Sequence, residues 1–281
     1  MEGKQVTELE ALPSFTDTSL LPVHNGAGLK KGLLSQLANY LGNKFSNPNL
    51  LINPDFKINQ RGATSYEQQG YSVDRWKIWN VTVTPITSGG ITVKSDKYSD
   101  TGTFVQPLEN ATEGDSTLSC YVTSVSGTVT MVADDNSQVV LKQGLNVVHT
   151  SKSTKNFIIF LNQGTSITLK WVKLEQGTVA TPFVAPNPAE ELTKCYRFKY
   201  IGKAVLRGRC TASQIFGFTK DLPTKLRTKP TTTFKLKNSY NVNTVDVTLA
   251  EENNAVYLAG TADNTNQTVI DVVLDLDAEI Y

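Results

Sequence analysis

The chain has 281 residues, which is enough for two modest domains that each bury a core. Its 27 basic and 26 acidic residues give a net charge of +1, so charge alone does not draw it to nucleic acid or an anionic membrane. It contains no run of about 18 apolar residues, and its polar N-terminus lacks the apolar core of a secretory signal. We therefore expect synthesis in a cytoplasm and no membrane insertion. The three cysteines are widely spaced and are expected to be buried rather than paired or metal-bound.

Residues 1–47 form the first predicted segment. Leu20 to Val23 is expected to be extended and to lead into a turn at residues 25–28. Leucines then recur every four residues, which predicts a helix with one apolar stripe, ending near Gly42: Leu29, Leu33, Leu37 and Leu41. A helix this short is marginal alone. Its stripe is expected to pack either on the chain's own β-domain or on copies of itself around a symmetry axis.

Residues 48–186 are predicted to form a β-sandwich. Short runs of β-forming residues recur every eight to twelve residues, separated by Gly, Ser, Asn and Asp. Within Leu118–Thr123, apolar and polar residues alternate, which predicts one buried and one open face. Strands are expected at Trp79–Thr84, Gly90–Lys94, Thr103–Pro107, Ser116–Val125, Gly127–Val132, Gln138–Leu141, Gly144–Thr150, Asn156–Leu161 and Ser166–Leu174.

Residues 187–281 are predicted to begin with a short helix from Pro188 to about Tyr200. Asn187 is a suitable N-cap, Pro188 fits the first helical position, and the first turn is acidic, with Glu190 and Glu191. Helical spacing would place Tyr196 and Tyr200 on one face. Together with Arg197, that face is interpreted as a contact between subunits.

A second β-domain is predicted after the helix, with strands including Thr231–Lys237, Val245–Leu249, Ala255–Gly260 and Thr268–Asp277. In a simple meander, the connections at 238–243 and 263–267 would emerge at the same end. One aromatic ring and several amides would then form a surface suited to a polyhydroxylated ligand: Tyr240, Asn241, Asn243, Asn264 and Asn266. Alternatively, these asparagines serve the backbone of the turns alone.

Short motifs in all three regions resemble bacteriophage tail fibres. The segment DTSLLPVHNGAGLKKGLLSQL is similar to the attachment region of phage tail proteins. The motifs NLLINPDF, SCYVTSVSGTVTM and WVKLEQGTVATPF resemble jelly-roll carbohydrate-binding modules of glycan-active enzymes and phage fibres. The helix with its paired aromatics and the closing LDLDAEI resemble the terminal head of tail fibres.

This resemblance implies a mainly β protein with a jelly-roll sandwich and a C-terminal β-sandwich head, assembled as a homotrimer in a virion after synthesis in the host bacterial cytoplasm. Residues 1–47 would bind a tail or baseplate protein, and the head would bind host cell-surface polysaccharide. The recurring Asp74-Arg75-Trp76 pattern implies that Trp76 packs in the sandwich core. Related modules carry a calcium-binding carboxylate where this chain has Lys57, so no metal is expected.

Catalysis is not expected from the residues present. His24 and His149 have no triad partners in sequence, and no cofactor motif is legible. The acids Glu109, Glu113 and Asp115 lie in a turn-rich stretch where solvated carboxylates are normal. A binding protein fits better, with the aromatics Trp79 and Tyr98 as further candidates for sugar stacking. Two alternatives stay open: a structural baseplate or collar component without receptor contact, and a glycan-depolymerising tail protein.

Overall fold

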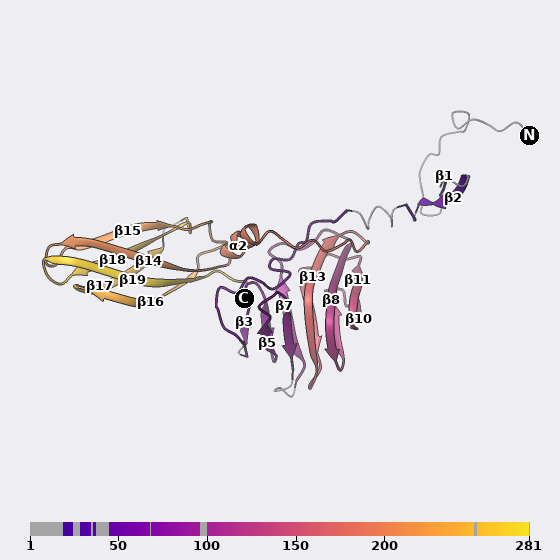
Figure 1. Ribbon diagram of the computed structural model, residues 1–281, viewed down its shortest axis with the longest axis horizontal. Coiled ribbons are helices and arrows are strands. Elements are labelled where there is room, and N and C mark those ends of the chain that lie inside the picture. The colour runs from indigo at the N-terminus through magenta and orange to yellow at the C-terminus, as the bar shows by residue number, and fades with distance from the viewer. Residues whose placement is uncertain are drawn as a thin grey trace, which may run out of the picture. The chain divides into compact units, whose positions relative to one another are not determined.

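The computed structural model describes residues 19–24, 29–34, 36–37, 45–67, 69–95, 100–249 and 252–280 (Figure 1). The chain divides into two compact units. One comprises Met1–Asn47 and Val179–Val184, and the other comprises Pro48–Thr178 and Ala185–Tyr281. Among the described residues, no helix has the length and apolar character needed to cross a membrane.

A β-hairpin is the main described feature of the first unit. Strand β1 (Leu20–His24) confirms the predicted extended segment and pairs antiparallel with β2 (Leu29–Leu33). The prediction that a helix begins at Leu29 is therefore wrong, because helical conformation starts only at Leu34. Gly32 disfavours a helix, and β1 offers hydrogen-bond partners to the extended chain.

The leucine stripe is divided by this change of conformation. Leu29 and Leu33 lie in β2, Leu37 is helical, and Leu41 lies outside the described residues. The Gln36 side chain accepts a hydrogen bond from the Leu33 backbone N–H at 3.0 Å, as the third residue of a helix does in a capping box. A single four-residue periodicity therefore spans a strand and the start of a helix.

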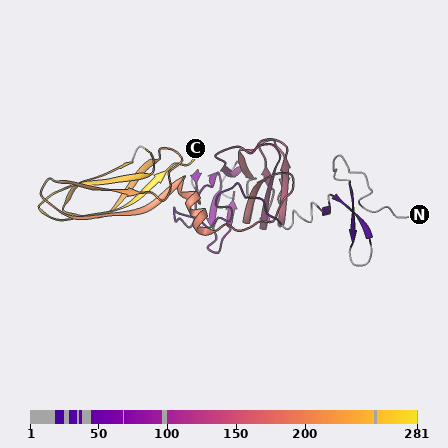
Figure 2. The ribbon, with the colours of Figure 1, turned by 90° about the horizontal axis from the view of Figure 1, so that it is seen from above.

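The second unit begins with a jelly-roll β-sandwich (Figure 2). Its five-stranded sheet has the order β11-β8-β13-β6-β5, formed by β5 (Thr82–Pro85), β6 (Ile91–Lys94), β8 (Ser116–Ser126), β11 (Gly144–Thr150) and β13 (Ser166–Gln176). The six-stranded sheet has the order β10-β9-β12-β7-β4-β3, formed by β3 (Gly70–Tyr71), β4 (Lys77–Trp79), β7 (Gly102–Pro107), β9 (Val129–Val132), β10 (Gln138–Val140) and β12 (Asn156–Leu161). The predicted strands are found here with small changes at their ends.

One predicted strand, Trp79–Thr84, is instead divided between the two sheets. Its first part belongs to β4 and its second part to β5. Asn80 adopts a left-handed conformation, with φ 51°, and turns the chain from one sheet to the other. Alternating polarity continues across this turn, which is why the sequence pattern resembled one strand.

Trp76 lies in the core of the sandwich and is 0 % exposed, as predicted. Its ring stacks on Phe104 with centroids 4.6 Å apart and meets Phe157 edge-on at 5.9 Å. Its indole N–H donates to the Asn53 carbonyl at 3.0 Å, so its polar atom is also satisfied. The opening Asn-Pro-Asp-Phe segment is thus held against the same tryptophan that centres the core, since Phe56 lies 5.1 Å from the Trp76 ring.

Helix α2 (Pro188–Tyr196) has the predicted N-terminus. The Asn187 side chain accepts a hydrogen bond from the Ala189 N–H at 2.9 Å. The helix ends four residues earlier than expected, because the chain enters strand β14 at Lys199. Tyr196 and Tyr200 therefore do not share a helical face, and that prediction is wrong. In Figure 1 and Figure 2, α2 lies between the jelly roll and the strands that follow it.

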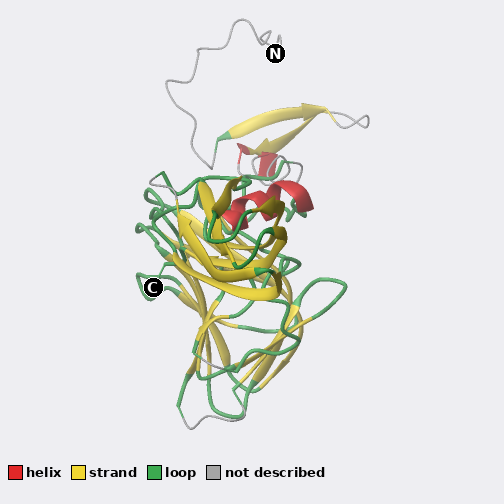
Figure 3. Cartoon of the chain, turned by 90° about the vertical axis from the view of Figure 1, so that its left-hand side faces the viewer, coloured by secondary structure: helices red, strands yellow, loops and turns green. Residues whose placement is uncertain are grey.

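The C-terminal head is a second, smaller β-sandwich (Figure 3). One sheet has the order β14-β19-β16, with β14 (Lys199–Cys210), β19 (Asn266–Asp277) and β16 (Thr231–Tyr240). The other has the order β15-β18-β17, with β15 (Ile215–Asp221), β18 (Ala255–Ala262) and β17 (Val242–Leu249). It is not a simple meander, because β16 and β17 belong to different sheets. Its core lies between the central strands and includes Val256, Leu258, Ile270, Val272 and Leu274.

Replacing Trp76 tests the core assignment. We expect Trp76→Ala to lower the free energy of unfolding by about 3–5 kcal/mol, because it removes a fully buried ring and leaves a cavity. Trp79→Ala is the matched control, since Trp79 is 47 % exposed, and should cost less than about 1 kcal/mol. Urea unfolding followed by circular dichroism measures both losses, and equal losses would contradict the assignment.

Candidate functional site

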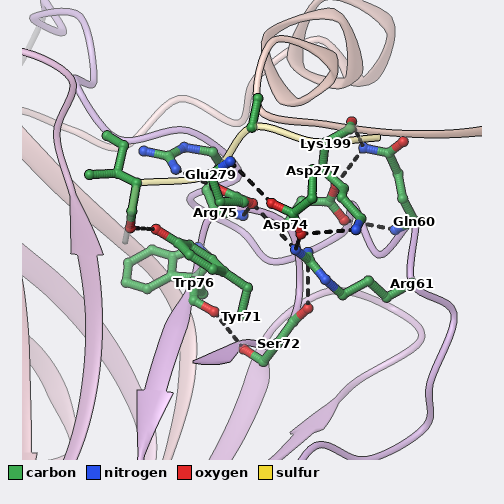
Figure 4. Close-up of polar contacts among 12 residues, drawn as sticks. Gln60, Arg61, Tyr71, Ser72, Asp74, Arg75, Trp76, Lys199, Asp277 and Glu279 are labelled. Carbon is green, nitrogen blue, oxygen red and sulfur yellow. Dashed lines mark hydrogen bonds and ion pairs between the residues drawn. The ribbon is translucent and has the colours of Figure 1, made fainter. Parts of the chain in front are cut away.

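The head is fastened to the jelly roll by a buried ion pair between Arg75 and Glu279 (Figure 4). Their side chains are 1 % and 0 % exposed, and Arg75 Nη1 lies 2.5 Å from Glu279 Oε2. Arg75 also donates from Nη2 to the Pro107 carbonyl at 2.7 Å, and its guanidinium stacks 3.7 Å over the Phe198 ring. One arginine of the jelly roll thus contacts both the start of the head and the end of the chain.

Further polar contacts surround this pair. Gln60 donates from Nε2 to Asp74 Oδ1 at 2.5 Å and to the Lys199 carbonyl at 2.7 Å. The Ile201 N–H donates to Gln60 Oε1 at 3.2 Å. Tyr71 donates to the Ile280 carbonyl. These bonds join the jelly roll to the start of β14 and to the residues that follow β19. The junction therefore resists hinge motion as well as separation.

The junction contains ionisable groups with shifted pKa values. Burial raises the pKa of Glu279, and the charge of Arg75 opposes that shift. Burial also raises the pKa of Asp74, against the hydrogen bonds from Gln60. It raises the pKa of Tyr71 to about 12. Such shifts often mark catalytic sites. Here the carboxylates are engaged by partners within the chain, which points to a structural role.

The tip is the end of the head opposite the junction, and it is formed by the connections that follow β14, β16 and β18. The Asn241 side chain donates to the Asn264 carbonyl and accepts from the Asn264 N–H, both at 2.7 Å. The predicted proximity of the two amide-rich connections is therefore confirmed. A third connection, Thr211–Gln214, joins them through Ala212 N–H, which donates to Thr265 Oγ1 at 3.0 Å.

The predicted tip residues differ in what they leave available to a ligand. Tyr240 is 55 % exposed at the end of β16. Asn243, Asn264 and Asn266 are also exposed. The Asn241 amide is consumed by its two bonds to Asn264, and its φ of 55° suits a turn residue. Asn266 Oδ1 accepts the Gln267 N–H at 2.8 Å. Part of the amide content thus serves the backbone, while Tyr240 stays accessible.

The remaining candidate sugar-stacking residues do not join the tip. Trp79 lies on β4 of the jelly roll, and Tyr98 lies outside the described residues. Sequence reasoning missed an apolar row on the outer face of the five-stranded sheet: Leu145, Tyr121 and Trp171 occupy paired positions on β11, β8 and β13. Leu145 and Tyr121 are exposed, and the Tyr121 and Trp171 ring centroids lie 6.1 Å apart. The alternation around Tyr121 was the available signal.

The residues predicted to contact another subunit have partners within the chain. Tyr200 is buried in the head core, and its ring lies 5.3 Å from that of Tyr196. Arg197 is exposed and forms an ion pair with Glu109 at 2.9 Å. These contacts join α2 to the head and the jelly roll. A role between subunits stays a prediction for Tyr196 and Arg197.

The candidate acidic residues lie in loops of the jelly roll. Glu109 and Glu113 line a hollow of about 530 Å³, but the Glu109 carboxylate already pairs with Arg197 and is not enclosed as a glycosidase acid must be. Asp134 accepts the backbone N–H groups of Lys155 and Asn156, which is a loop-ordering role. No cluster of His, Cys, Asp and Glu that could hold a metal occurs in the part of the chain that the structure describes. The Lys57 ammonium lies 2.8 Å from the Asp55 carboxylate.

No family model matches the sequence, and no curated protein matches it. Among solved structures, two of discoidin II from Dictyostelium discoideum are similar at 10% sequence identity. The recombinant protein gives a TM-score of 0.22 over 68% of this chain and 84% of that chain. The wild-type protein gives 0.21 over 68% and 82%. A likeness at this level supports no statement about ligand or partner.

Replacing Glu279 tests the junction. We expect Glu279→Gln to lower the free energy of unfolding by about 3 kcal/mol or more, because it leaves the buried Arg75 guanidinium without a countercharge. Glu113→Gln is the control, since Glu113 is exposed, and should change stability by less than about 0.5 kcal/mol. Urea unfolding measures the loss. A small, equal effect of both changes would mean that the junction does not depend on this pair.

Proposed function

We propose that the chain is a receptor-binding protein of the phage tail-fibre or tail-tip type, which adheres without catalysis to polysaccharide on a bacterial surface. The observation that carries this proposal is the exposed Tyr240 ring at a tip whose connections are held together by side-chain hydrogen bonds. The resemblance of the chain's sequence motifs to tail fibres supports the same class of protein.

Tyr240 has the physical properties needed for weak sugar recognition. An aromatic face packs against the apolar C–H face of a pyranose, while neighbouring amides and carboxylates bond its hydroxyls. Asn264 is exposed in the neighbouring connection, and Asn266 is exposed at the start of β19. The Asn241 bonds hold that connection in place, so little conformational entropy is lost when a ligand binds.

We further propose that the protein acts as a homotrimer in a virion, with residues 1–47 attached to a tail or baseplate protein. Phe234 and Leu236 support self-association, because they are exposed apolar residues on β16, an edge strand of the head. Several linked copies would raise a weak single-site affinity by orders of magnitude. Adhesion then needs no deep pocket in any one head.

Replacing Tyr240 tests the adhesion site. We expect Tyr240→Ala to weaken binding of the protein to intact host cells at least tenfold, which corresponds to about 1.4 kcal/mol. Tyr257→Ala is the matched control, because Tyr257 is 43 % exposed on β18 in the opposite sheet of the head. It should bind as the unchanged protein does. Cell-binding assays with labelled protein provide the measurement.

Cell binding, blocking of phage adsorption and release of reducing ends together separate the alternatives. If the unchanged protein neither binds host cells nor blocks phage adsorption, the chain is a structural baseplate or collar component. If it releases reducing ends from host polysaccharide, it is a depolymerising tail protein. If both tyrosine changes weaken cell binding equally, Tyr240 is not the specific contact residue, but the proposed adhesive function still holds.

The oligomeric state provides a separate test. Light scattering should give three times the mass of one chain, and replacing both Phe234 and Leu236 by Ser should reduce it, because the proposed contact loses its apolar surface. The control replaces Val140 and Leu145 by Ser, which are exposed apolar residues of the jelly roll. A single-chain mass for the unchanged protein would refute the trimer.

A further inference from the structure

Five basic residues gather on the outer face of the β14-β19-β16 sheet of the head. This set, called the cationic face, consists of Lys203, Arg207 and Arg209 on β14 and Lys235 and Lys237 on β16. All five are exposed. Within the part of the chain that the structure describes, none of them forms an ion pair with a carboxylate. The whole chain carries only +1, so this is a local excess of positive charge.

Strand register puts these cations on either side of an apolar floor. Lys203 and Lys235 both pair with Val273 of the central strand. Adjacent strands lie about 4.8 Å apart, so the Cα atoms of the two lysines are about 10 Å apart across the valine. Val273 also lines a hollow of about 280 Å³ together with Lys235, Lys237 and Asp275.

The cationic face reaches the candidate adhesion residue. Arg207 and Tyr240 both pair with Val269, so they flank it as the two lysines flank Val273. Directly opposite residues of paired strands share a face, and Val269 alternates with the buried Ile270. Tyr240 therefore lies on the outer face with Arg207, and the surface runs continuously from Lys235 to the tip.

Three acidic residues of β19 share this face, but two of them are already engaged. Asp275 and Asp277 lie 2.5 and 3.0 Å from the Lys199 ammonium, near the junction. Asp271 remains, between Val205 and Asn238 in the register, and its Oδ1 atom is buried without a hydrogen-bond partner. The area from Lys203 to the tip thus has five cations and one carboxylate.

We propose that the cationic face binds an acidic polysaccharide, a hydroxylated chain that carries carboxylate or phosphate groups at intervals. The inference rests on the proposed adhesive function and adds the charge class of the glycan. Lysine and arginine side chains bind the anionic groups, and Val269 and Val273 contact the apolar faces of the sugar rings.

Asp271 favours a glycan over a nucleic acid. A carboxylate in the middle of the surface repels the closely spaced phosphates of a nucleic acid backbone. Its other oxygen, Oδ2, is available to accept hydrogen bonds from sugar hydroxyls, which occur between the charged groups of an acidic polysaccharide. Tyr240 is the one aromatic residue of this described sheet that pairs with an outward-facing residue of β19, and Phe234, which is 40 % exposed, borders the hollow at Val273. Single-stranded nucleic acids are instead bound through several stacked bases.

The test measures binding of the full-length chain to immobilised polymers. Polygalacturonate supplies carboxylates, a phosphomannan supplies phosphates, and dextran is the neutral reference. We expect binding to at least one acidic polymer, at least tenfold tighter than to dextran. Raising the salt concentration from about 0.01 M to about 0.15 M should weaken it severalfold, because the screening length falls from about 30 Å to about 8 Å.

Paired variants separate a specific surface from a change in net charge. Replacing Lys235 and Lys237 by Gln should weaken binding to the acidic polymer at least fivefold. Replacing Lys225 and Lys229 by Gln removes the same charge from exposed positions elsewhere in the head and should have little effect. Circular dichroism of each variant verifies that the head stays folded.

Several outcomes would overturn the inference. Equal losses from the two lysine pairs would mean that net charge alone acts, and tighter binding to single-stranded DNA than to either acidic polymer would assign the surface to nucleic acid. Host-cell adhesion without binding to any acidic polymer would refute the cationic face and leave the proposed function intact. Binding to acidic polymers without cell adhesion would instead refute the proposed function.

Discussion

The arrangement of the second unit depends on the buried pair of Arg75 and Glu279. Neither charge can be buried alone without a penalty of several kcal/mol, so each requires the other in place. Such a pair adds little net stability over apolar packing, because desolvation offsets most of its attraction. Its contribution is geometric: the arginine must face the C-terminal segment and stack on Phe198 at the same time. Together with the Gln60 bonds to β14, these contacts fix the orientation of β14 and β19 relative to the jelly roll.

This fixed junction has consequences for the tip. Strand β14 has twelve residues, which at about 3.3 Å per residue separate the junction from the tip by about 35–40 Å. A hinge at the base would let the tip sweep a wide volume, and binding would then cost the entropy of that motion. A head held at several points avoids most of that cost. In the proposed trimer, weak contacts on the linked heads would then act together.

Local patterns in the sequence predicted much of this fold, and the failures have a common cause. Alternation identified the jelly-roll strands, and Asn187-Pro188 identified the start of α2, because both signals come from neighbouring residues. The ion pair joins residues 204 positions apart, so no local pattern contains it. The β-sandwich head was predicted, but the simple meander was wrong for the same reason, since β19 pairs with β14 and β16, which both lie well before it in sequence. At Leu29, a four-residue period fits a helix, but pairing with β1 decides the conformation.

The proximity of the tip connections was predicted correctly, but the structure changes the role expected of Asn241. Sequence reasoning brought the amide-rich connections together, and the Asn241 bonds to Asn264 confirm that proximity. The same bonds occupy the Asn241 amide. A bound ligand would therefore have to contact side chains whose polar or aromatic groups have no partner of this kind within the chain. Tyr240 is one such side chain, and its register with Val269 and Arg207 places it on the sheet face rather than within the loops. A flat face with separated cations contacts an extended polymer at several points, whereas a loop cluster suits the end of a chain. Under the proposed function, the head would therefore contact a polysaccharide along its length rather than at its terminus.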